Sequence, residues 1–193
     1  MKVTGIDLAG VESRPTGLCI MDDLLCSSTS LLYTDDEILD KTLECAPGVV
    51  AIDAPLALPR GRKSLTRRSK IHLRECDREL LRMGIKFFPL TLGPMRYLTE
   101  RGMRLRAELE KKGLMVIETY PGAVQDILHI PRKGKGIERL AQGLSLAGVR
   151  GLNTGLTGDE LDAVTCALVG IFYLRGKYRA IGDPDEILMI LPQ

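Results

Sequence analysis

The sequence predicts an α/β protein built on a mixed β-sheet, with a helical segment inserted near its middle. Two patterns lead to this fold class. Short apolar runs of strand type alternate with segments whose apolar residues recur at helical spacing. The run over residues 48–53 is apolar almost throughout, which indicates a strand covered on both faces, as in sheets with parallel strands.

The N-terminal part predicts three antiparallel strands and a helical crossover. Residues 2–8 form the first strand, and 16–21 and 24–32 form a hairpin. The T-x-x-E sequence at 34–37 is a capping box that opens a helix. Because a helix leads into the strand at 48–53, we expect this strand to run parallel to the first.

The region from about 60 to 112 is predicted to be a basic helical insertion. One helix is expected from about Ser69 to Met83 and a second from Pro94 to Lys112. The region carries sixteen Lys and Arg against six Asp and Glu, whereas the rest of the chain carries eleven against nineteen. This excess is typical of a surface that binds a polyanion, although a solvated helical face would show it as well.

The last part of the chain predicts short strands separated by helices. Residues 114–118 and 187–191 are expected to be strands, and helices are expected after Pro121, over 136–147 and after the Gly-rich loop at 151–158. No internal repeat or long linker divides the chain, so residues 1–193 are predicted to form one domain.

The absence of targeting signals and the pattern of cysteines predict a cytoplasmic protein that has reduced cysteines and no membrane contact. The N-terminus lacks the regions of a signal peptide. The longest apolar helical segment, 163–174, is shorter than the roughly 20 residues that span a bilayer. The five cysteines form no C-x-x-C pair and are expected to be free thiols in the core.

Acidic residues stand where apolar runs end. Asp7, Asp53 and Glu118 each close a strand-type run, and Asp159 and Asp162 lie about one turn apart at the start of a helix. If the three strands are parallel neighbours joined by right-handed crossovers, their acids meet at the sheet edge where open α/β sheets bind ligands. Small residues after Asp162 on its helical face would let this helix approach the sheet.

Such a set of acids favours a site for a divalent cation. Two like charges about 4 Å apart repel by roughly 4 kcal/mol at an effective dielectric of 20, so clustered carboxylates shift their pKa values, separate or bind a cation. Carboxylate oxygens are ligands that Mg²⁺ and Mn²⁺ prefer. Taken singly, each acid also has a structural explanation, as a turn residue or as a charge at a helix N-terminus.

Several segments together resemble a known family. In chain order they are Gly5-Ile6-Asp7-Leu8-Ala9-Gly10, Ala51-Ile52-Asp53-Ala54-Pro55, Arg74-x-Cys76-Asp77-Arg78, Glu118-Thr119-Tyr120-Pro121 and Asp159-Glu160-Leu161-Asp162-Ala163. With these segments the chain resembles, over essentially its whole length, the uncharacterised family of predicted RNase H-like nucleases called domain of unknown function 429. The resemblance implies an RNase H-like three-layer fold whose mixed sheet has the order 3-2-1-4-5.

The resemblance also implies a nuclease that hydrolyses phosphodiester bonds with two Mg²⁺ or Mn²⁺ ions. Asp7 is the expected bridging ligand, with Asp53 and Asp162 each completing one metal site. Glu118 or Asp159 is expected to bind metal or to orient the attacking water. The expected catalytic residues are thus Asp7, Asp53, Glu118 and Asp162, and the expected metal ligands are Asp7, Asp53, Asp159 and Asp162.

Nucleic acid is the expected partner, and basic side chains of the insertion are the expected phosphate contacts. These are Arg60, Arg62, Lys63, Arg67, Arg68, Lys70, Arg74 and Arg78. For Arg74 and Arg78, pairing with acids on nearby turns is an alternative. The absence of Trp and an aromatic content of 4% argue against a stacking platform for single strands. The aromatic residues Phe87, Phe88, Tyr97 and Tyr120 are therefore expected in the core.

Two other functions fit parts of the sequence. Actin-like and sugar-kinase phosphotransferases share this sheet topology, and the turn at 5–10 weakly matches their phosphate-binding turn, but no second Gly-rich adenosine loop is present. A non-catalytic nucleic-acid binder or scaffold of the same fold would cleave nothing under any metal condition. It would also lose no function in Asp7→Asn.

Overall fold

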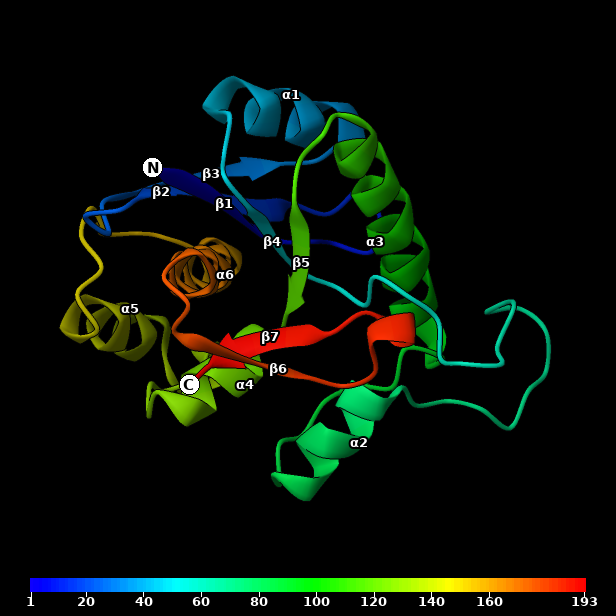
Figure 1. Cartoon of the computed structure of the whole chain (residues 1–193). Helices are drawn as coiled ribbons and strands as arrows, with labels where there is room; N and C mark the ends of the chain where they lie inside the picture. The colour runs from blue at the N-terminus through cyan, green and yellow to red at the C-terminus, as the bar shows by residue number, and fades with distance from the viewer.

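Seven strands in one mixed sheet organise the protein. The computed structural model describes residues 1–193, and the strand order is β3-β2-β1-β4-β5-β7-β6 (Figure 1). The strands are β1 (Lys2–Asp7), β2 (Thr16–Asp22), β3 (Ser27–Leu32), β4 (Val50–Asp53), β5 (Val116–Thr119), β6 (Tyr178–Ile181) and β7 (Met189–Pro192). β1, β2 and β3 form an antiparallel meander, β4, β5 and β7 run parallel to β1, and β6 returns antiparallel to β7. The first five strands stand in the predicted 3-2-1-4-5 order.

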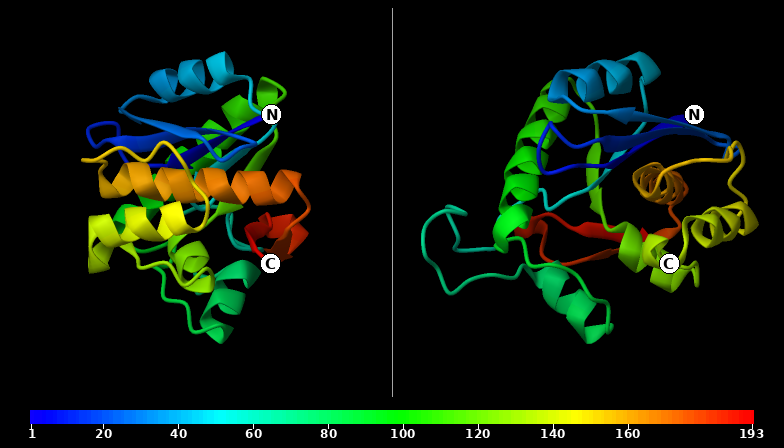
Figure 2. Two further views of the ribbon diagram at one scale, coloured as in Figure 1. Left: turned by 90° about the vertical axis from the view of Figure 1, so that its left-hand side faces the viewer. Right: turned by 180° about the vertical axis from the view of Figure 1, so that it is seen from behind.

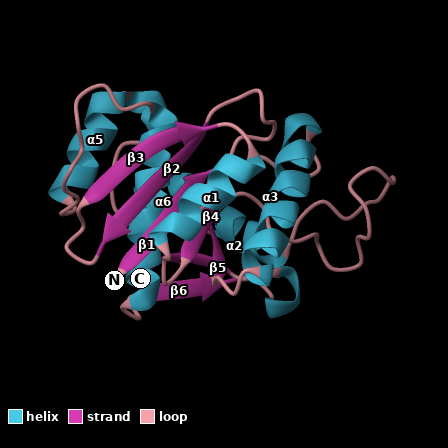
Figure 3. Ribbon diagram, turned by 90° about the horizontal axis from the view of Figure 1, so that it is seen from above, coloured by secondary structure: helices cyan, strands magenta, loops and turns pink.

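Helices cover both faces of this sheet. They are α1 (Asp35–Cys45), α2 (Glu75–Arg82), α3 (Gly93–Lys111), α4 (Pro121–Ile127), α5 (Ile137–Leu146) and α6 (Gly158–Leu174), with short 3-10 turns η1 (Lys133–Lys135) and η2 (Pro184–Glu186). α1 and α3 lie over one face, and α6 with α4 and α5 lies over the other (Figures 2 and 3). Each face has its own apolar core, so the fold has three layers. None of the helices is both long enough and apolar enough to cross a membrane.

Two capping boxes start helices where the sequence predicts them. At α1, the Thr34 hydroxyl accepts a hydrogen bond from the backbone N–H of Glu37 at 3.2 Å, and the Glu37 carboxylate accepts one from the N–H of Thr34 at 2.9 Å. Thr157 and Glu160 make the same pair of bonds at the start of α6. Each box satisfies N–H groups that have no partner inside the helix. The second box therefore places Asp159 in the first turn of α6.

Helix α6 lies close to the sheet because glycines face it. A Cβ on Gly5 of β1 would overlap the carbonyl oxygen of Ala163, and a Cβ on Gly17 of β2 would overlap that of Asp159. No residue larger than glycine fits at either place without moving the helix. The close packing brings the first turns of α6 to the carboxyl end of β1, as the small residues on its sheet-facing side predict.

The insertion and the C-terminal edge differ from the sequence-based expectation. The basic helix expected from about Ser69 begins only at Glu75, because Arg74 keeps an extended backbone and donates its N–H to the Asp77 carboxylate at 2.8 Å. Residues 60–74 instead form an irregular loop that projects from the body of the protein (Figure 1). Strand β6 shows no strand pattern in the sequence: only Ile181 of its four residues is buried, and pairing with β7 holds it at the sheet edge.

Candidate active site

Two of the three acids at strand ends point to the same side of the sheet. Asp7 of β1 stands beside Asp53 of β4, and Asp53 stands beside Thr119 of β5. Side chains alternate between the two faces of a sheet along each strand. Asp7 and Asp53 therefore point to the face where Gly5 packs against α6.

Glu118 stands one residue earlier in β5 and points to the opposite face. Its neighbour in the sheet is Ile52, which belongs to the core beneath α1 and α3. The Glu118 carboxylate is buried and accepts two hydrogen bonds from Arg74, both at 2.6 Å, and one from the backbone N–H of Leu56 at 2.8 Å. Glu118 therefore leaves its strand on the other face from Asp7 and Asp53, although it lines one cavity with Asp53 and its charge adds to the rise of the Asp53 pKa.

Arg74 belongs to this buried group and is not free to bind phosphate. Only 1% of the residue is exposed, and a guanidinium N–H also contacts the Asp77 carboxylate at 3.3 Å. Burial opposes the charge of Arg74, but the Glu118 carboxylate outweighs it and holds the Arg74 pKa above its usual value. Arg74, Asp77 and Glu118 are called the buried triad below. One guanidinium nitrogen of the triad, Nε of Arg74, is buried without a partner.

Helix α6 adds two carboxylates beside β1, and a lysine ammonium group contacts them. Lys133 Nζ lies 2.8 Å from Asp162 Oδ2, 3.1 Å from Asp159 Oδ1 and 3.6 Å from Asp7 Oδ2. Asp7, Asp53, Asp159 and Asp162 are called the acid cluster below. Lys133 thus contacts Asp7, Asp159 and Asp162, and Asp53 stands beside Asp7 in the sheet.

Sequence reasoning missed Lys133. It lies in a short glycine-containing turn, η1, outside the basic insertion and far along the chain from Asp7. Gly136, which follows this turn, has φ of 123°, a backbone angle that glycine adopts readily. No spacing rule connects Lys133 to the acids, because only the packing of the α4–α5 connection against α6 places it there.

The acid cluster carries more negative charge than Lys133 neutralises. Burial raises the pKa of Asp7 to about 7, the charges of Asp162 and Asp159 add to the rise, and Lys133 partly opposes it. Burial, together with the charges of Asp7 and Asp162, also raises the pKa of Asp53 well above its usual value. No hydrogen bond to the Asp53 carboxylate contributes. Asp53 is thus the member of the cluster with the least compensation.

Asp162 is held in place from two sides. Gln125 of α4 donates its amide N–H to Asp162 Oδ1 at 2.7 Å and contacts the Thr165 hydroxyl at 3.2 Å. Lys133 contacts the other carboxylate oxygen. Gln125 is only 1% exposed, so its amide is fixed by packing and in turn orients Asp162.

The donor atoms of the acid cluster fit a divalent metal. All are carboxylate oxygens, and the raised pKa values of Asp7 and Asp53 reflect charge that a bound cation would neutralise. In this structure no three His, Cys, Asp or Glu side chains converge closely enough to hold an ion. The Lys133 ammonium stands beside Asp7 and Asp162 instead, so an ion that uses both carboxylates must displace it.

The remaining expected phosphate contacts divide into paired and unpaired side chains. Arg60 contacts Asp183 and Asp185 at 3.4 and 3.3 Å. Arg62 is buried and donates to backbone carbonyl groups of its own loop. Arg78 pairs with Glu75 one turn away, as its structural alternative predicts. The side chains that stay exposed in the loop and form no ion pair are Lys63, Arg67, Arg68 and Lys70.

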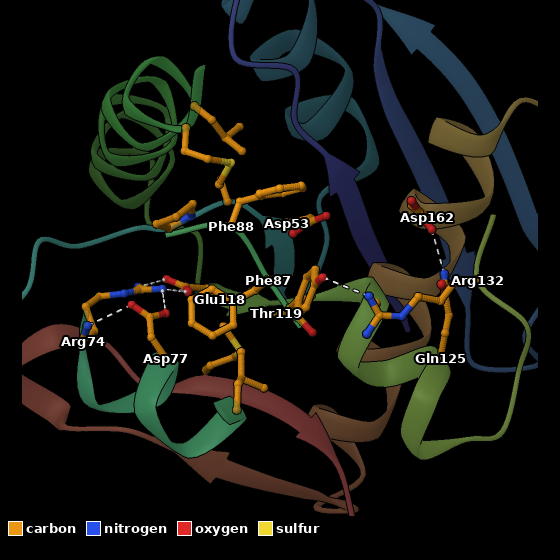
Figure 4. Close-up of a pocket in the computed structure, with 18 of the residues that line it drawn as sticks. Asp53, Arg74, Asp77, Phe87, Phe88, Glu118, Thr119, Gln125, Arg132 and Asp162 are labelled. Atoms are coloured by element: carbon orange, nitrogen blue, oxygen red, sulfur yellow. Dashed lines mark hydrogen bonds and ion pairs between the residues drawn. The ribbon is translucent and has the colours of Figure 1, made fainter. Parts of the chain in front are cut away.

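A hollow of about 410 Å³ opens beside the acid cluster and contains aromatic side chains (Figure 4). Phe87 and Phe88 line it together with Asp53 and Asp162. Phe88 is 68% exposed, and Tyr97, near the start of α3, is 61% exposed. The expectation that they belong to the core is wrong, because nearby aliphatic residues fill the core positions of this segment. This hollow is called the aromatic hollow below.

Comparisons with known proteins identify a matching family and structures of similar fold. The family model described as "protein of unknown function (DUF429)" matches residues 5–187. A Thermus thermophilus RuvC structure is similar, with a TM-score of 0.51 and 14% sequence identity over 91% of this chain and 97% of that one. T. thermophilus RuvC in complex with Holliday junction substrate gives the same TM-score and identity, over 91% and 96% of the two chains. The comparison with curated proteins finds no match.

At 14% identity, the likeness to RuvC shows the fold alone, which is RNase H-like. The sheet order and the three layers of the chain agree with that assignment. The family model spans nearly all of the sequence and includes every member of the acid cluster. The chain therefore belongs to DUF429, a family of proteins of unknown function, and it has an RNase H-like fold.

Proposed function

We propose that this protein is a metal-dependent nuclease that hydrolyses phosphodiester bonds at the acid cluster. The observation that carries this proposal is the meeting of carboxylates from β1, β4 and α6 with only one ammonium group to neutralise them. The RNase H-like fold supports it by analogy. Nucleic acid is the proposed partner, because the irregular loop adds exposed basic side chains that bear no ion pair.

Asp7, Asp53 and Asp162 are the proposed ligands of two Mg²⁺ or Mn²⁺ ions, and Asp159 is a further candidate. When bound, such ions supply an activated water and stabilise the leaving oxygen of the phosphodiester. Gln125 orients Asp162 through its 2.7 Å hydrogen bond, so it is a positioning residue. Glu118 belongs to the buried triad and has no proposed contact with substrate.

Lys133 has two roles in this proposal. Without metal, it neutralises part of the charge that Asp7, Asp159 and Asp162 share. With metal present, its ammonium group is the cation nearest to the acid cluster for a substrate phosphate, and Arg132 stands beside it in the wall of the aromatic hollow. Neither side chain is among the basic residues predicted from the sequence, and Lys133 contacts the acid cluster directly.

The proposal is tested by cleavage of a labelled oligonucleotide with Mg²⁺, with Mn²⁺ and with EDTA. We expect cleavage only with metal and a loss of about 100-fold or more in Asp53→Asn, because metal stabilisation of the transition state contributes several kcal/mol. Asp36→Asn is the matched control, since Asp36 is exposed on α1 away from the cluster. Calorimetric titration with Mn²⁺ measures metal binding separately.

Three results would contradict the proposal. Cleavage by the wild type in EDTA would exclude a metal-dependent reaction. Undiminished cleavage by Asp53→Asn would exclude this cluster as its site. Metal-stimulated hydrolysis of ATP without cleavage of any oligonucleotide would favour a phosphotransferase of related fold.

A further inference from the structure

The aromatic hollow joins two kinds of surface. At one end its wall includes Asp53 and Asp162 of the acid cluster together with Lys133. The insertion contributes apolar side chains to the wall, together with Arg74 and Asp77 of the buried triad. The apolar lining residues there are Leu80, Phe87, Phe88, Met95 and Leu98. In the view of Figure 4, Phe87 and Phe88 lie between the buried triad on one side and Asp162 on the other.

Phe88 is an exposed ring with no packing role. At 68% exposure it is among the most exposed large apolar side chains of the chain. Phe88 lies in the wall of the hollow, and exposed apolar surface in a cavity is typical of a binding site.

Most polar groups in the wall already have partners within the protein. Arg74, Asp77 and Glu118 bind one another. The Tyr120 hydroxyl donates to the Lys86 carbonyl, and Arg132 donates to Asp126 and to the Tyr120 hydroxyl. The hollow thus offers apolar and aromatic surface to the faces of a ligand and few groups for hydrogen bonds to its edges.

A volume of about 410 Å³ lies in the usual range of small-ligand pockets, roughly 300 to 1,000 Å³. A suitable occupant has a flat apolar face, and it carries an anionic group at the end where Lys133, Arg132 and any bound metal stand. One unit of a nucleic-acid strand has both parts. Its base would enter the hollow while its phosphate lies at the acid cluster.

We propose that the aromatic hollow binds an unpaired nucleobase, stacked on Phe88, of the strand whose phosphate lies at the acid cluster. This inference rests on the proposed nuclease function and narrows its substrate to single strands or unpaired positions. A base inside a duplex is stacked and paired, so it reaches the hollow only after it leaves the helix. Because edge contacts are few, the site takes any base that can stack.

The test measures binding of a single-stranded oligonucleotide that contains 2-aminopurine, whose fluorescence changes when the base stacks. Asp7→Asn with Mn²⁺ is the parent protein, so that the strand stays intact under the proposed mechanism. We expect Phe88→Ala in this background to weaken single-strand binding by about 5-fold or more and to remove the fluorescence change. Phe88→Trp, which keeps a stacking surface, is expected to restore both.

Tyr33→Ala is the matched control, because Tyr33 is also an exposed aromatic residue but lies outside the hollow. A blunt duplex of the same sequence is expected to bind the parent and Phe88→Ala equally. Unchanged single-strand affinity in Phe88→Ala would overturn the inference. So would an equal loss of affinity for the single strand and the duplex, because this would assign Phe88 a general role in the surface.

Binding and cleavage separate this inference from the proposed function. If the wild type cleaves single strands with Mn²⁺ but Phe88→Ala binds them normally, the base site is wrong and the nuclease proposal stands. If single-strand binding depends on Phe88 while the wild type cleaves no oligonucleotide with any metal, the base site is supported and the nuclease proposal fails.

Discussion

The acid cluster and the buried triad both line the aromatic hollow, and Asp53 and Glu118 reach it from opposite faces of the sheet, but the charges of the two groups are compensated differently. In the triad, one guanidinium group makes hydrogen bonds to both Glu118 and Asp77, and Glu118 receives a further backbone N–H. In the cluster, the carboxylates share the single ammonium of Lys133, and the pKa values of Asp7 and Asp53 are raised. Each carboxylate of the triad thus contacts a guanidinium group, whereas the cluster is left with charge for an external cation.

This difference indicates that the buried triad contributes to stability and that the acid cluster is a candidate functional site. In a buried ion-pair group whose charged side chains hydrogen-bond one another, loss of one partner leaves the others unpaired. Like charges held together cost stability, and proteins keep such arrangements mainly at sites that bind or react. The comparison therefore predicts opposite effects when a charge is removed from each group.

The largest expected effect is the loss of Arg74. Arg74→Met leaves Glu118 and Asp77 buried without their cation, so we expect the free energy of unfolding to fall by about 3–5 kcal/mol. Chemical denaturation measures it. Arg78→Met, which removes only an exposed ion pair on α2, is expected to cost less than about 1 kcal/mol. Equal losses of unfolding free energy in the two variants would show that the triad contributes no more to stability than an exposed ion pair does.

Removal of a charge from the acid cluster is expected to raise the free energy of unfolding, in contrast to the loss of Arg74. The Asp7 pKa is about 7 in the folded protein, against 3.8 for an unperturbed Asp side chain. Between these values the folded protein keeps a proton that the unfolded chain has released, so stability falls as pH rises through this window. The Asn side chain of Asp7→Asn does not ionise, so the variant does not lose stability in this way. We expect it to be more stable than the wild type by on the order of 2 kcal/mol at pH 8.

Denaturation at pH 4, 6 and 8 in EDTA measures this effect. The advantage of Asp7→Asn is expected to shrink toward pH 4, where the wild-type carboxyl group is protonated in the folded state. Asp36→Asn, at an exposed position of α1, should show no such trend. A wild type that gained stability relative to Asp7→Asn as pH rises would show that the Asp7 charge is well compensated, and the comparison between cluster and triad would fail.

The smallest expected effect concerns Lys133, which competes with a metal ion for the same carboxylates. Lys133→Met is expected to bind Mn²⁺ about tenfold more tightly, equivalent to about 1.4 kcal/mol, and to be less stable than the wild type without metal. Calorimetry and thermal unfolding in EDTA measure the two quantities. Lys135→Met, in the same turn but without an ion pair, is the control. Weaker Mn²⁺ binding in Lys133→Met would show that the lysine supports the metal site.

Local patterns predicted much of the fold. The capping boxes at Thr34 and Thr157 were readable because a helix start needs side chains at fixed offsets. The first five strands were readable because apolar runs and the helical crossover specify pairing and direction. Strand β6 was missed because an edge strand with one buried residue has no apolar alternation to detect.

The candidate site was predicted in part. Asp7, Asp53 and the α6 pair lie at one edge of the sheet, where strand ends and the first turn of a crossover helix meet, and their role as metal ligands stays a prediction. Glu118 lines the same hollow as Asp53, but Arg74 binds its carboxylate. Glu118 stands one position before Thr119, the residue beside Asp53, and strand alternation sends it to the other face.

By itself, the sequence determined the class of fold, the helix starts and the positions of most of the acids, since each depends on residues close together in the chain or on strand direction. Only the tertiary structure decided how those charges are compensated. Lys133 reaches the cluster from a distant turn, Arg74 is drawn into the interior by Glu118, and Phe88 is turned outward while its neighbours fill the core. These outcomes depend on which segments pack together, and no local pattern encodes that.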